Sequence, residues 1–343
     1  FAIVLILKIY CIQLIINQLN KIIFRQKNNS ITERVIIIPD GVLGYLPFAA
    51  LLTRAVTREQ VGDYANYPFL LEQQQISYAP SATLLREQFR PVSAPAEAHL
   101  LAFAPTFGSP ARSLVAADRS GLAPLLHNRR EVRSITRLFN GEAFYGAEAT
   151  RSRFLQTAPH YRYLHLSSHA RLNDQQAEYS YISFTQTRDD ELDKSALLYV
   201  DDLYNVPLNA DLVVLSACET AVGKLSRGEG IISLARAFSY AGAKSIITTL
   251  WRVNDQKSAD LMINFYENLA NRQAKDAALR NAQRNLIREG TAAHPYFWAG
   301  FIPIGNPEPI FQTSQTFYWF YIFLLLMIFI GIISFFLVRS KSK

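Results

Sequence analysis

Short runs of apolar and β-branched residues alternate with helical patterns along most of this chain. The runs predict strands over 35–38, 99–103, 161–168, 181–185, 212–217, 245–250 and 297–304. Apolar residues at helical spacing predict helices over 81–89, 129–139, 231–241, 255–270 and 274–288. The run 212–217 is apolar at nearly every position, as is typical of a strand covered on both faces. The alternation predicts an α/β fold with a mostly parallel sheet flanked by helices.

A much longer apolar run lies near the end of the sequence. Residues 317–338 contain no charge, and aromatic residues crowd their first positions. A helix of this length, at about 1.5 Å per residue, crosses a hydrocarbon core of roughly 30 Å. We therefore expect a C-terminal transmembrane helix over 317–338, between a linker over 308–316 and a basic tail over 339–343. Basic residues favour the cytoplasmic side, which would place the body outside the cytoplasm unless insertion is post-translational.

Residues 1–34 form an apolar and basic lead-in to the first predicted strand of the body. The chain begins with Phe1, so this stretch could be the remnant of a longer N-terminal region. A signal peptide or second membrane span is the alternative, but Lys8 interrupts the apolar run and no small-residue cleavage site is evident. We expect a packed helix in this lead-in.

Composition and charge narrow the class of protein. The 343 residues include 35 Lys and Arg against 28 Asp and Glu, a net charge of +7. Residues 35–316 hold 27 of each sign, so the excess lies at the two ends. A neutral body gives no support to nucleic-acid binding, and we expect no nucleic-acid partner. Two cysteines exclude a disulfide framework and a multi-cysteine zinc module.

Two reactive residues follow the ends of predicted strands. His169 comes after the strand 161–168, and Cys218 comes after the strand 212–217, 49 residues further on. Functional groups of an open α/β sheet gather at the carboxyl ends of its strands. An imidazole within reach can convert a thiol to a thiolate near neutral pH, and a His about 50 residues before a Cys resembles caspases. The pair predicts a Cys–His dyad, although each residue alone also fits a structural role.

The neighbours of the two residues add to this prediction. The backbone N–H groups of Ala170 and Cys218 could form an oxyanion hole, and glycines after Cys218 permit close backbone approach. His165 shares a strand face with His169, because it lies four residues earlier, and is the rival base. Its position in the middle of the strand favours a role in the core.

Seven stretches of the sequence resemble the CHAT domain, a caspase-like, separase-related peptidase domain often found after tetratricopeptide repeats. They are 35–51, 78–85, 146–154, 163–174, 210–223, 227–255 and 294–307, and they include Ser-Ala-Cys-Glu-Thr around Cys218. The resemblance covers 35–307 and implies a caspase–haemoglobinase fold. It also implies that Cys218 and His169 cleave a protein or peptide substrate through a thioester intermediate, without metal or cofactor.

Three features of the family pattern bear on activity. Ala170 stands where the family usually has Gly, although its backbone N–H survives, and no tetratricopeptide-type sensor region precedes the domain in this chain. Glu219 and Asp255 match acidic positions of the pattern, so either could recognise a basic side chain of the substrate. Glu219 could equally be a local hydrogen bonder. For Asp255 we prefer a role as N-cap of the helix that follows it.

These observations lead to one expected function and one alternative. We expect a membrane-anchored cysteine endopeptidase of the CHAT type. The alternative is a catalytically silent, membrane-tethered interaction module of the same fold. Retention of both dyad residues favours the peptidase, whereas Ala170 and the missing repeats favour the alternative.

Overall fold

The computed structural model describes most of residues 34–310 and one strand before them. The described ranges are 2–7, 34–90, 98–107, 122–173, 176–186, 193–216, 219–220 and 230–310. Of residues 2–7, 98–99, 219–220 and 230–233 the backbone alone is described. Cys218, the linker, the predicted membrane helix and the basic tail lie outside these ranges, except residues 308–310 of the linker.

The central sheet consists of two parallel blocks that meet at one antiparallel pair. The first block contains β12 (Ser245–Thr249), β10 (Leu212–Ser216), β6 (Tyr161–Ser167), β4 (Ala98–Ala104) and β5 (Glu142–Tyr145). The second block contains β13 (Phe301–Gly305), β3 (Gln75–Tyr78), β2 (Arg34–Pro39) and β1 (Ala2–Leu7). Strands β12 and β13 pair antiparallel, so the blocks run in opposite directions. The expectation of a mostly parallel sheet is confirmed.

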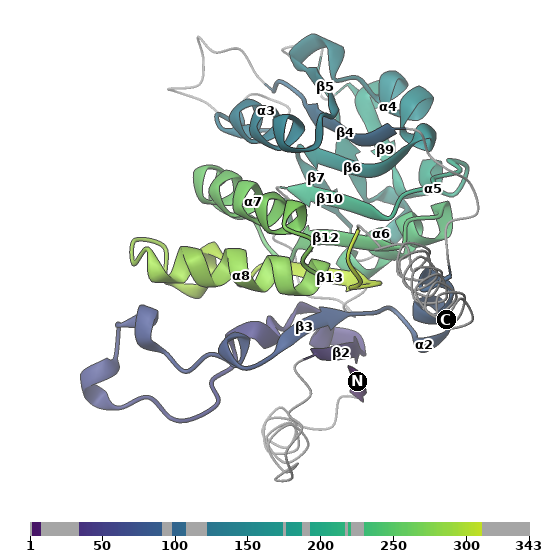
Figure 1. Cartoon of the computed structure of the whole chain (residues 1–343). Helices are drawn as coiled ribbons and strands as arrows, with labels where there is room; N and C mark the ends of the chain where they lie inside the picture. The colour runs from purple at the N-terminus through teal and green to yellow at the C-terminus, as the bar shows by residue number, and fades with distance from the viewer. Residues whose placement is uncertain are drawn as a thin grey trace, which may run out of the picture.

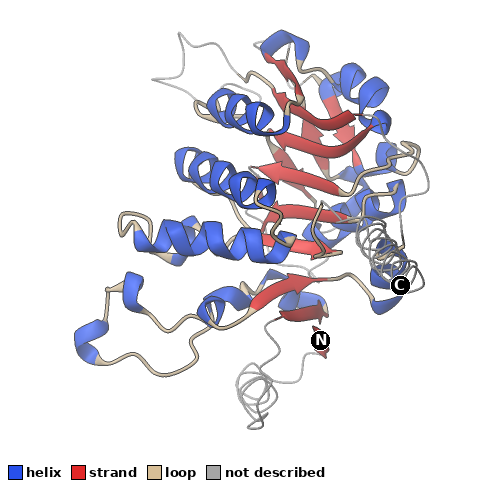
Figure 2. Cartoon of the chain, in the orientation of Figure 1, coloured by secondary structure: helices blue, strands red, loops and turns tan. Residues whose placement is uncertain are grey.

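Helices cover both faces of this sheet (Figure 1, Figure 2). One face carries α3 (Asn128–Phe139), α7 (Asp255–Ala270) and α8 (Lys275–Arg288) side by side. The other face carries α2 (Ala82–Gln88), α4 (Arg151–Thr157), α5 (Val200–Leu203) and α6 (Gly230–Ala241). Because the central strands are covered on both sides, every residue of β10, β12 and β13 is buried.

A second, four-stranded sheet continues from two strands of the first. Its order is β11-β7-β8-β9, formed by β11 (Glu219–Thr220), β7 (Ala170–Leu172), β8 (Tyr181–Ser183) and β9 (Leu197–Tyr199). The chain leaves β6 and enters β7 after two residues, and it leaves β10 and enters β11 after two residues. Both predicted dyad residues fall in these two short breaks.

Some expected elements differ from those observed. Residues 2–7 form a strand that pairs with β2, where we expected a helix, because the run Ala-Ile-Val-Leu-Ile-Leu suits a parallel ladder at the edge of β2. The expected strand over 297–304 begins only at Phe301, since Pro295–Phe297 form a short 3-10 helix. The strands β3, β5, β7 and β9 were not expected, because three or four residues contain too few periods to give a pattern.

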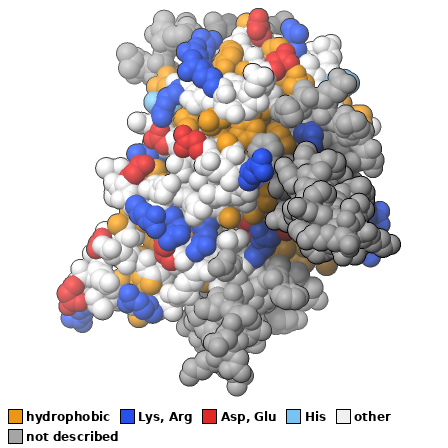
Figure 3. Space-filling model, in the orientation of Figure 1, with side chains coloured by type: hydrophobic (Ala, Val, Ile, Leu, Met, Phe, Trp, Pro, Cys, Tyr) orange, Lys and Arg blue, Asp and Glu red, His pale blue; other side chains and the backbone are white. Residues whose placement is uncertain are grey.

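The surface of the described body carries charges of both signs. Lys and Arg side chains are interspersed with Asp and Glu on the face shown in Figure 3, in agreement with the 27 basic and 27 acidic residues of 35–316. Within the described ranges, no helix combines the length and hydropathy needed to cross a membrane.

Candidate active site

The two strands that precede the predicted dyad are neighbours in the sheet and end in register. Ser167, the last residue of β6, pairs with Ser216, the last residue of β10. His169 lies two residues after Ser167, and position 218 lies two residues after Ser216. The two positions therefore follow strand ends that are aligned with each other. Cys218 itself lies outside the described residues.

The strands that follow the predicted dyad are also paired. Arg171 of β7 lies opposite Glu219 of β11, and the two strands run parallel. On one side of His169, Ser167 pairs with Ser216, and on the other side Arg171 pairs with Glu219. Ser216 and Glu219 lie on either side of position 218. The backbone pairing thus places residues on either side of His169 next to residues on either side of position 218, which is 49 residues further along the sequence.

The backbone of Ala170 is oriented toward the β11 side of β7. The ladder between β7 and β8 uses the Ser183 N–H, which donates to the His169 carbonyl at 2.8 Å. Ala170 lies opposite Ile182, at the non-hydrogen-bonded position of this antiparallel pair. Its N–H therefore points away from β8, and its φ is not positive, so Ala fits where the family pattern has Gly.

The ring of His169 is held by a backbone carbonyl. Its Nε2 lies 2.7 Å from the carbonyl oxygen of Ala123, and the Phe107 ring packs edge-on with centroids 4.7 Å apart. A carbonyl only accepts hydrogen bonds, so Nε2 carries the proton and the neutral ring has its lone pair on Nδ1. Nδ1 is thereby the nitrogen that can take a proton. The residue is 3% exposed.

Ala123 belongs to a short segment, residues 122–127, that we call the strap. The strap leads directly into α3, and at that junction Asn128 donates its side-chain N–H to the Pro105 carbonyl at 2.8 Å. Asp255, the first residue of α7, accepts the backbone N–H of His127 at 2.8 Å. The strap is therefore fixed to two other parts of the molecule beside the carbonyl that holds His169.

The role expected for Asp255 is corrected by these contacts. The N-cap of α7 is Asn254, whose side-chain oxygen accepts the Lys257 N–H at 3.0 Å. The Asp255 carboxylate points instead to the backbone amides of Leu126 and His127. Burial raises the pKa of Asp255, and these two amides oppose the rise.

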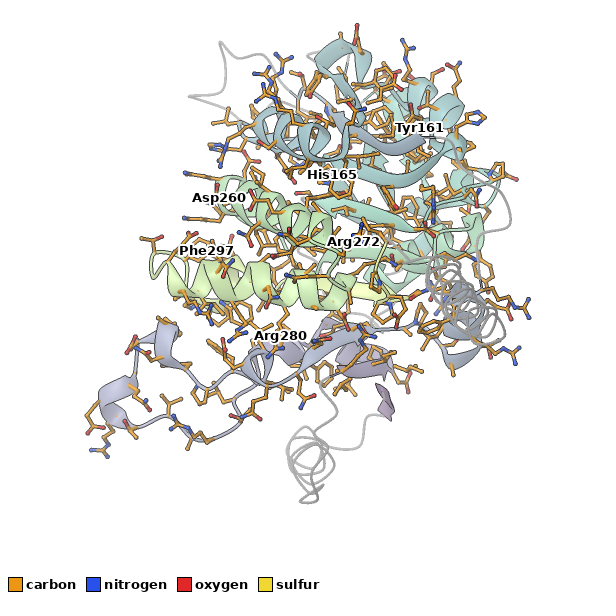
Figure 4. All side chains as sticks on the ribbon, viewed as in Figure 1. Tyr161, His165, Asp260, Arg272, Arg280 and Phe297 are labelled. Atoms are coloured by element: carbon orange, nitrogen blue, oxygen red, sulfur yellow. The ribbon has the colours of Figure 1, made fainter. Side chains whose placement is uncertain are left out.

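His165 belongs to a sealed polar network and is not a rival base. Its side chain lies in the interior between β6, α3 and α7 (Figure 4), with Nε2 3.1 Å from Glu131 Oε1 and Nδ1 3.2 Å from the Tyr266 hydroxyl. The Nε2 contact lacks the alignment of a hydrogen bond. Ser167 completes the network by donating to the other oxygen of Glu131 at 2.8 Å. Burial, and then Glu131, raise the pKa of Tyr266 far above its usual range.

Three of the five predicted site residues have described surroundings that can be compared with expectation. His169 and Ala170 lie together at the end of β6, whereas Asp255 lies beside the strap; of Glu219 only the backbone in β11 is described. The strap and the Ala123 carbonyl were missed, because a backbone acceptor leaves no signal in the residue types. No group of three His, Cys, Asp or Glu within the described ranges is placed to hold a metal ion.

The chain belongs to the CHAT domain family, whose model matches residues 11–306. Two curated relatives are the tetratricopeptide repeat protein 28 of Mus musculus, 24% identical over 313 residues, and that of Homo sapiens, 25% identical over 322 residues. Each match covers 82% of this chain and 12% of the relative. The chain thus spans about an eighth of the length of these relatives.

Solved structures of similar fold include a cysteine proteinase. The Arg-specific cysteine proteinase gingipain R superposes with a TM-score of 0.52 at 13% identity, over 87% of this chain and 68% of that one. The complex of the pro- and mature domains of Porphyromonas gingivalis RgpB gives 0.53 at 13% identity, over 87% and 70%. The fold is therefore caspase-like, and it is shared with cysteine peptidases.

Proposed function

We propose that this chain is a cysteine endopeptidase in which His169 and Cys218 form the catalytic dyad. The observation that carries the proposal is the double pairing of Ser167 with Ser216 and of Arg171 with Glu219, on either side of the dyad positions. A chance pair of His and Cys has no reason to follow the aligned ends of neighbouring parallel strands. The family membership and the fold shared with cysteine peptidases support it further.

The tautomer of His169 with its proton on Nε2, which the Ala123 carbonyl favours, suits the chemistry of the proposed reaction. Nδ1 takes the proton of the Cys218 thiol, and the thiolate attacks the carbonyl carbon of the scissile bond. The resulting imidazolium is stabilised because its Nε2–H donates to the Ala123 carbonyl. His169 then returns the proton to the leaving amine, and water releases the acyl group from sulfur.

Backbone amides would stabilise the negative charge that develops on the substrate oxygen. The N–H of Ala170 is directed away from β8, on the side of β7 where β11 runs. Together with the N–H of Cys218 it forms the proposed oxyanion hole. This role uses the backbone alone, so Ala at position 170 serves as well as Gly. For the substrate side chain, Glu219 is the remaining candidate acid.

The test of the dyad is labelling with a peptide that carries a thiol-reactive electrophile. We expect the label on Cys218, its loss in Cys218→Ala, and a decrease of about a hundredfold in His169→Ala. Cys11→Ala is the matched control, since Cys11 is the other cysteine of the chain, and should label as the parent does. Labelling that persists in Cys218→Ala would overturn the proposal.

A second candidate function is a silent interaction module of the same fold. The burial of His169, at 3% exposure beneath Phe107, favours it, because a peptidase must admit substrate to its base. Substrate profiling of the parent and of Cys218→Ala separates the two functions. Cleavage that needs the Cys218 thiol supports the peptidase, and identical profiles support the silent module.

We also propose that residues 317–338 anchor the chain in a membrane. The support is the uncharged, aromatic-flanked run and the basic residues after it. Carbonate extraction of membranes should leave the parent chain in the pellet and release a variant ending at residue 310. Reporters fused to each end would decide the side on which the body lies, for which the basic tail favours the outside of the cytoplasm.

A further inference from the structure

Asp255 and His169 are joined by a short path of described contacts. The Asp255 carboxylate accepts the backbone N–H of His127, at one end of the strap, at 2.8 Å, and the neighbouring Leu126 amide also lowers its pKa. Ala123, near the other end of the strap, presents its carbonyl oxygen 2.7 Å from His169 Nε2. We propose that Asp255 is a positioning residue, which fixes the strap so that the Ala123 carbonyl holds the His169 ring. The proposal rests on the proposed function of His169.

The acceptor for the His127 N–H comes from outside the strap. His127 occupies the N-cap position of α3, and its side chain makes no capping hydrogen bond. The first backbone N–H groups of a helix have no acceptor within the helix, so they need one from another part of the molecule. Asp255 supplies the acceptor from the first turn of α7. Its negative charge at the start of α3 is also favoured by the helix dipole.

Apolar packing does not replace this anchor. Leu126, beside the anchored amide, is 76% exposed, whereas Leu122 at the other end of the strap is buried. The strap is therefore held by packing at one end and by a carboxylate at the other, with Ala123 between them. Loss of the carboxylate would remove the hydrogen bond at His127 and leave this end of the strap held by α3 and by the bond from Asn128 to the Pro105 carbonyl.

The same contacts argue against Asp255 as the acid that binds a basic substrate side chain. The His127 amide already binds one of its oxygens, the Leu126 amide lowers its pKa, and the side chain is half-buried beside Glu131. Glu131 is the acidic neighbour, and its charge raises the pKa of Asp255 as burial does. A substrate cation would have to compete with amides that are fixed in the fold.

The experiment measures alkylation of Cys218 by iodoacetamide in the full chain as a function of pH. Iodoacetamide carries no basic side chain, so it reports the thiol and its base without any contribution from substrate recognition. We expect the neutral-pH rate to fall about tenfold in Asp255→Ala and less in Asp255→Asn, which retains one oxygen acceptor. The matched control is Asp260→Ala, which removes a carboxylate joining α7 to Arg130 of α3 at 2.6 Å without touching the strap.

A second readout follows the His169 ring without requiring any reactivity. In a chain labelled with ¹⁵N-histidine, an Nε2–H held by a carbonyl gives a slowly exchanging proton signal, assigned through His169→Gln. We expect this signal in the parent and in Asp260→Ala, and its loss in Asp255→Ala. Asp255→Asn, which preserves the shape of the side chain, guards against a folding defect in the alanine variant.

The outcomes separate this proposal from the one on which it rests. Unchanged alkylation and an unchanged ring signal in Asp255→Ala would overturn the positioning role, and so would a changed substrate preference alone. If His169→Gln leaves the alkylation of Cys218 unchanged, the proposed dyad fails, whereas the ring signal still decides whether Asp255 holds His169.

Discussion

Two polar regions of this protein satisfy their hydrogen-bonding groups in different ways. At the start of α8, Arg34 donates to both oxygens of Asp276 at 2.5 and 3.0 Å and to Glu308 at 2.9 Å. Lys275 lies beside them and donates to the Asn306 carbonyl at 3.0 Å. We call these four charged residues the charged cluster. Here charged side chains neutralise one another across long sequence separations.

The strand-end site around His169 is built from backbone groups instead. The ring is held by the Ala123 carbonyl, the strap is held through its amides, and the proposed oxyanion donors are N–H groups. Such groups cannot be removed by changing a side chain, and the proposed chemistry uses the side chains of His169 and Cys218. We therefore expect changes in the charged cluster to affect stability, and changes at the strand-end site to affect reactivity.

The largest effect is expected on breaking the charged cluster. Asp276→Ala leaves Arg34 without its main partner and should lower the unfolding free energy by about 3 kcal/mol, measured by urea denaturation. Replacing both residues, as Arg34→Met with Asp276→Leu, should cost less than this, because burial of the ion pair is itself unfavourable. If Asp276→Ala folds but its Cys218 is alkylated more slowly, the charged cluster affects reactivity as well as stability. That result would contradict the expected difference between the two regions.

Lys275 should give the charged cluster a distinct pH dependence. Burial lowers the pKa of its ammonium group to about 8 in the folded protein, against about 10.4 in the unfolded chain. Between these values the unfolded chain binds the extra proton, so stability rises with pH and the penalty is greatest below about pH 8. Compared with Lys275→Met, the parent should gain roughly 3 kcal/mol from neutral pH to about pH 10.4. The unfolding free energy of both proteins is measured by urea denaturation as a function of pH. A difference between them that stays constant over this pH range would contradict the prediction.

Tyr266→Phe tests whether the network of His165, like the charged cluster, affects stability and not reactivity. The variant removes the hydroxyl 3.2 Å from His165 Nδ1 and should lower the unfolding free energy by about 1–2 kcal/mol. The pH profile of Cys218 alkylation should stay as in the parent. A shifted profile would show that His165 takes part in the chemistry of the strand-end site.

The smallest effect is expected at position 170. Ala170→Gly keeps the backbone N–H, so peptide labelling should change by less than about twofold. The unfolding free energy should fall by about 0.5–1 kcal/mol, because glycine in a strand costs conformational entropy. A large gain in labelling would mean that Ala170 impairs the oxyanion hole.

Much of the central fold could be predicted from sequence, because its buried strands and amphipathic helices carry clear periods. The strands ending at Ser167 and Ser216 were expected within one residue, and His169 was placed from them. The N-terminal strand was mistaken for a helix, since an apolar run has no period of its own. The strap could not be predicted, because its contacts use the backbone carbonyl of Ala123 and the backbone N–H of His127, and every residue type except proline supplies both groups.

The most direct test of the account compares the pKa of the Cys218 thiol in the parent and in His169→Ala. It is read from the pH dependence of iodoacetamide alkylation, resolved by peptide mass spectrometry, with Cys11 as the second thiol of the chain. If His169 is the base, the Cys218 pKa in the parent lies well below the ordinary value of about 8.5 and returns toward it in His169→Ala. An ordinary Cys218 pKa that is the same in both proteins would contradict the account.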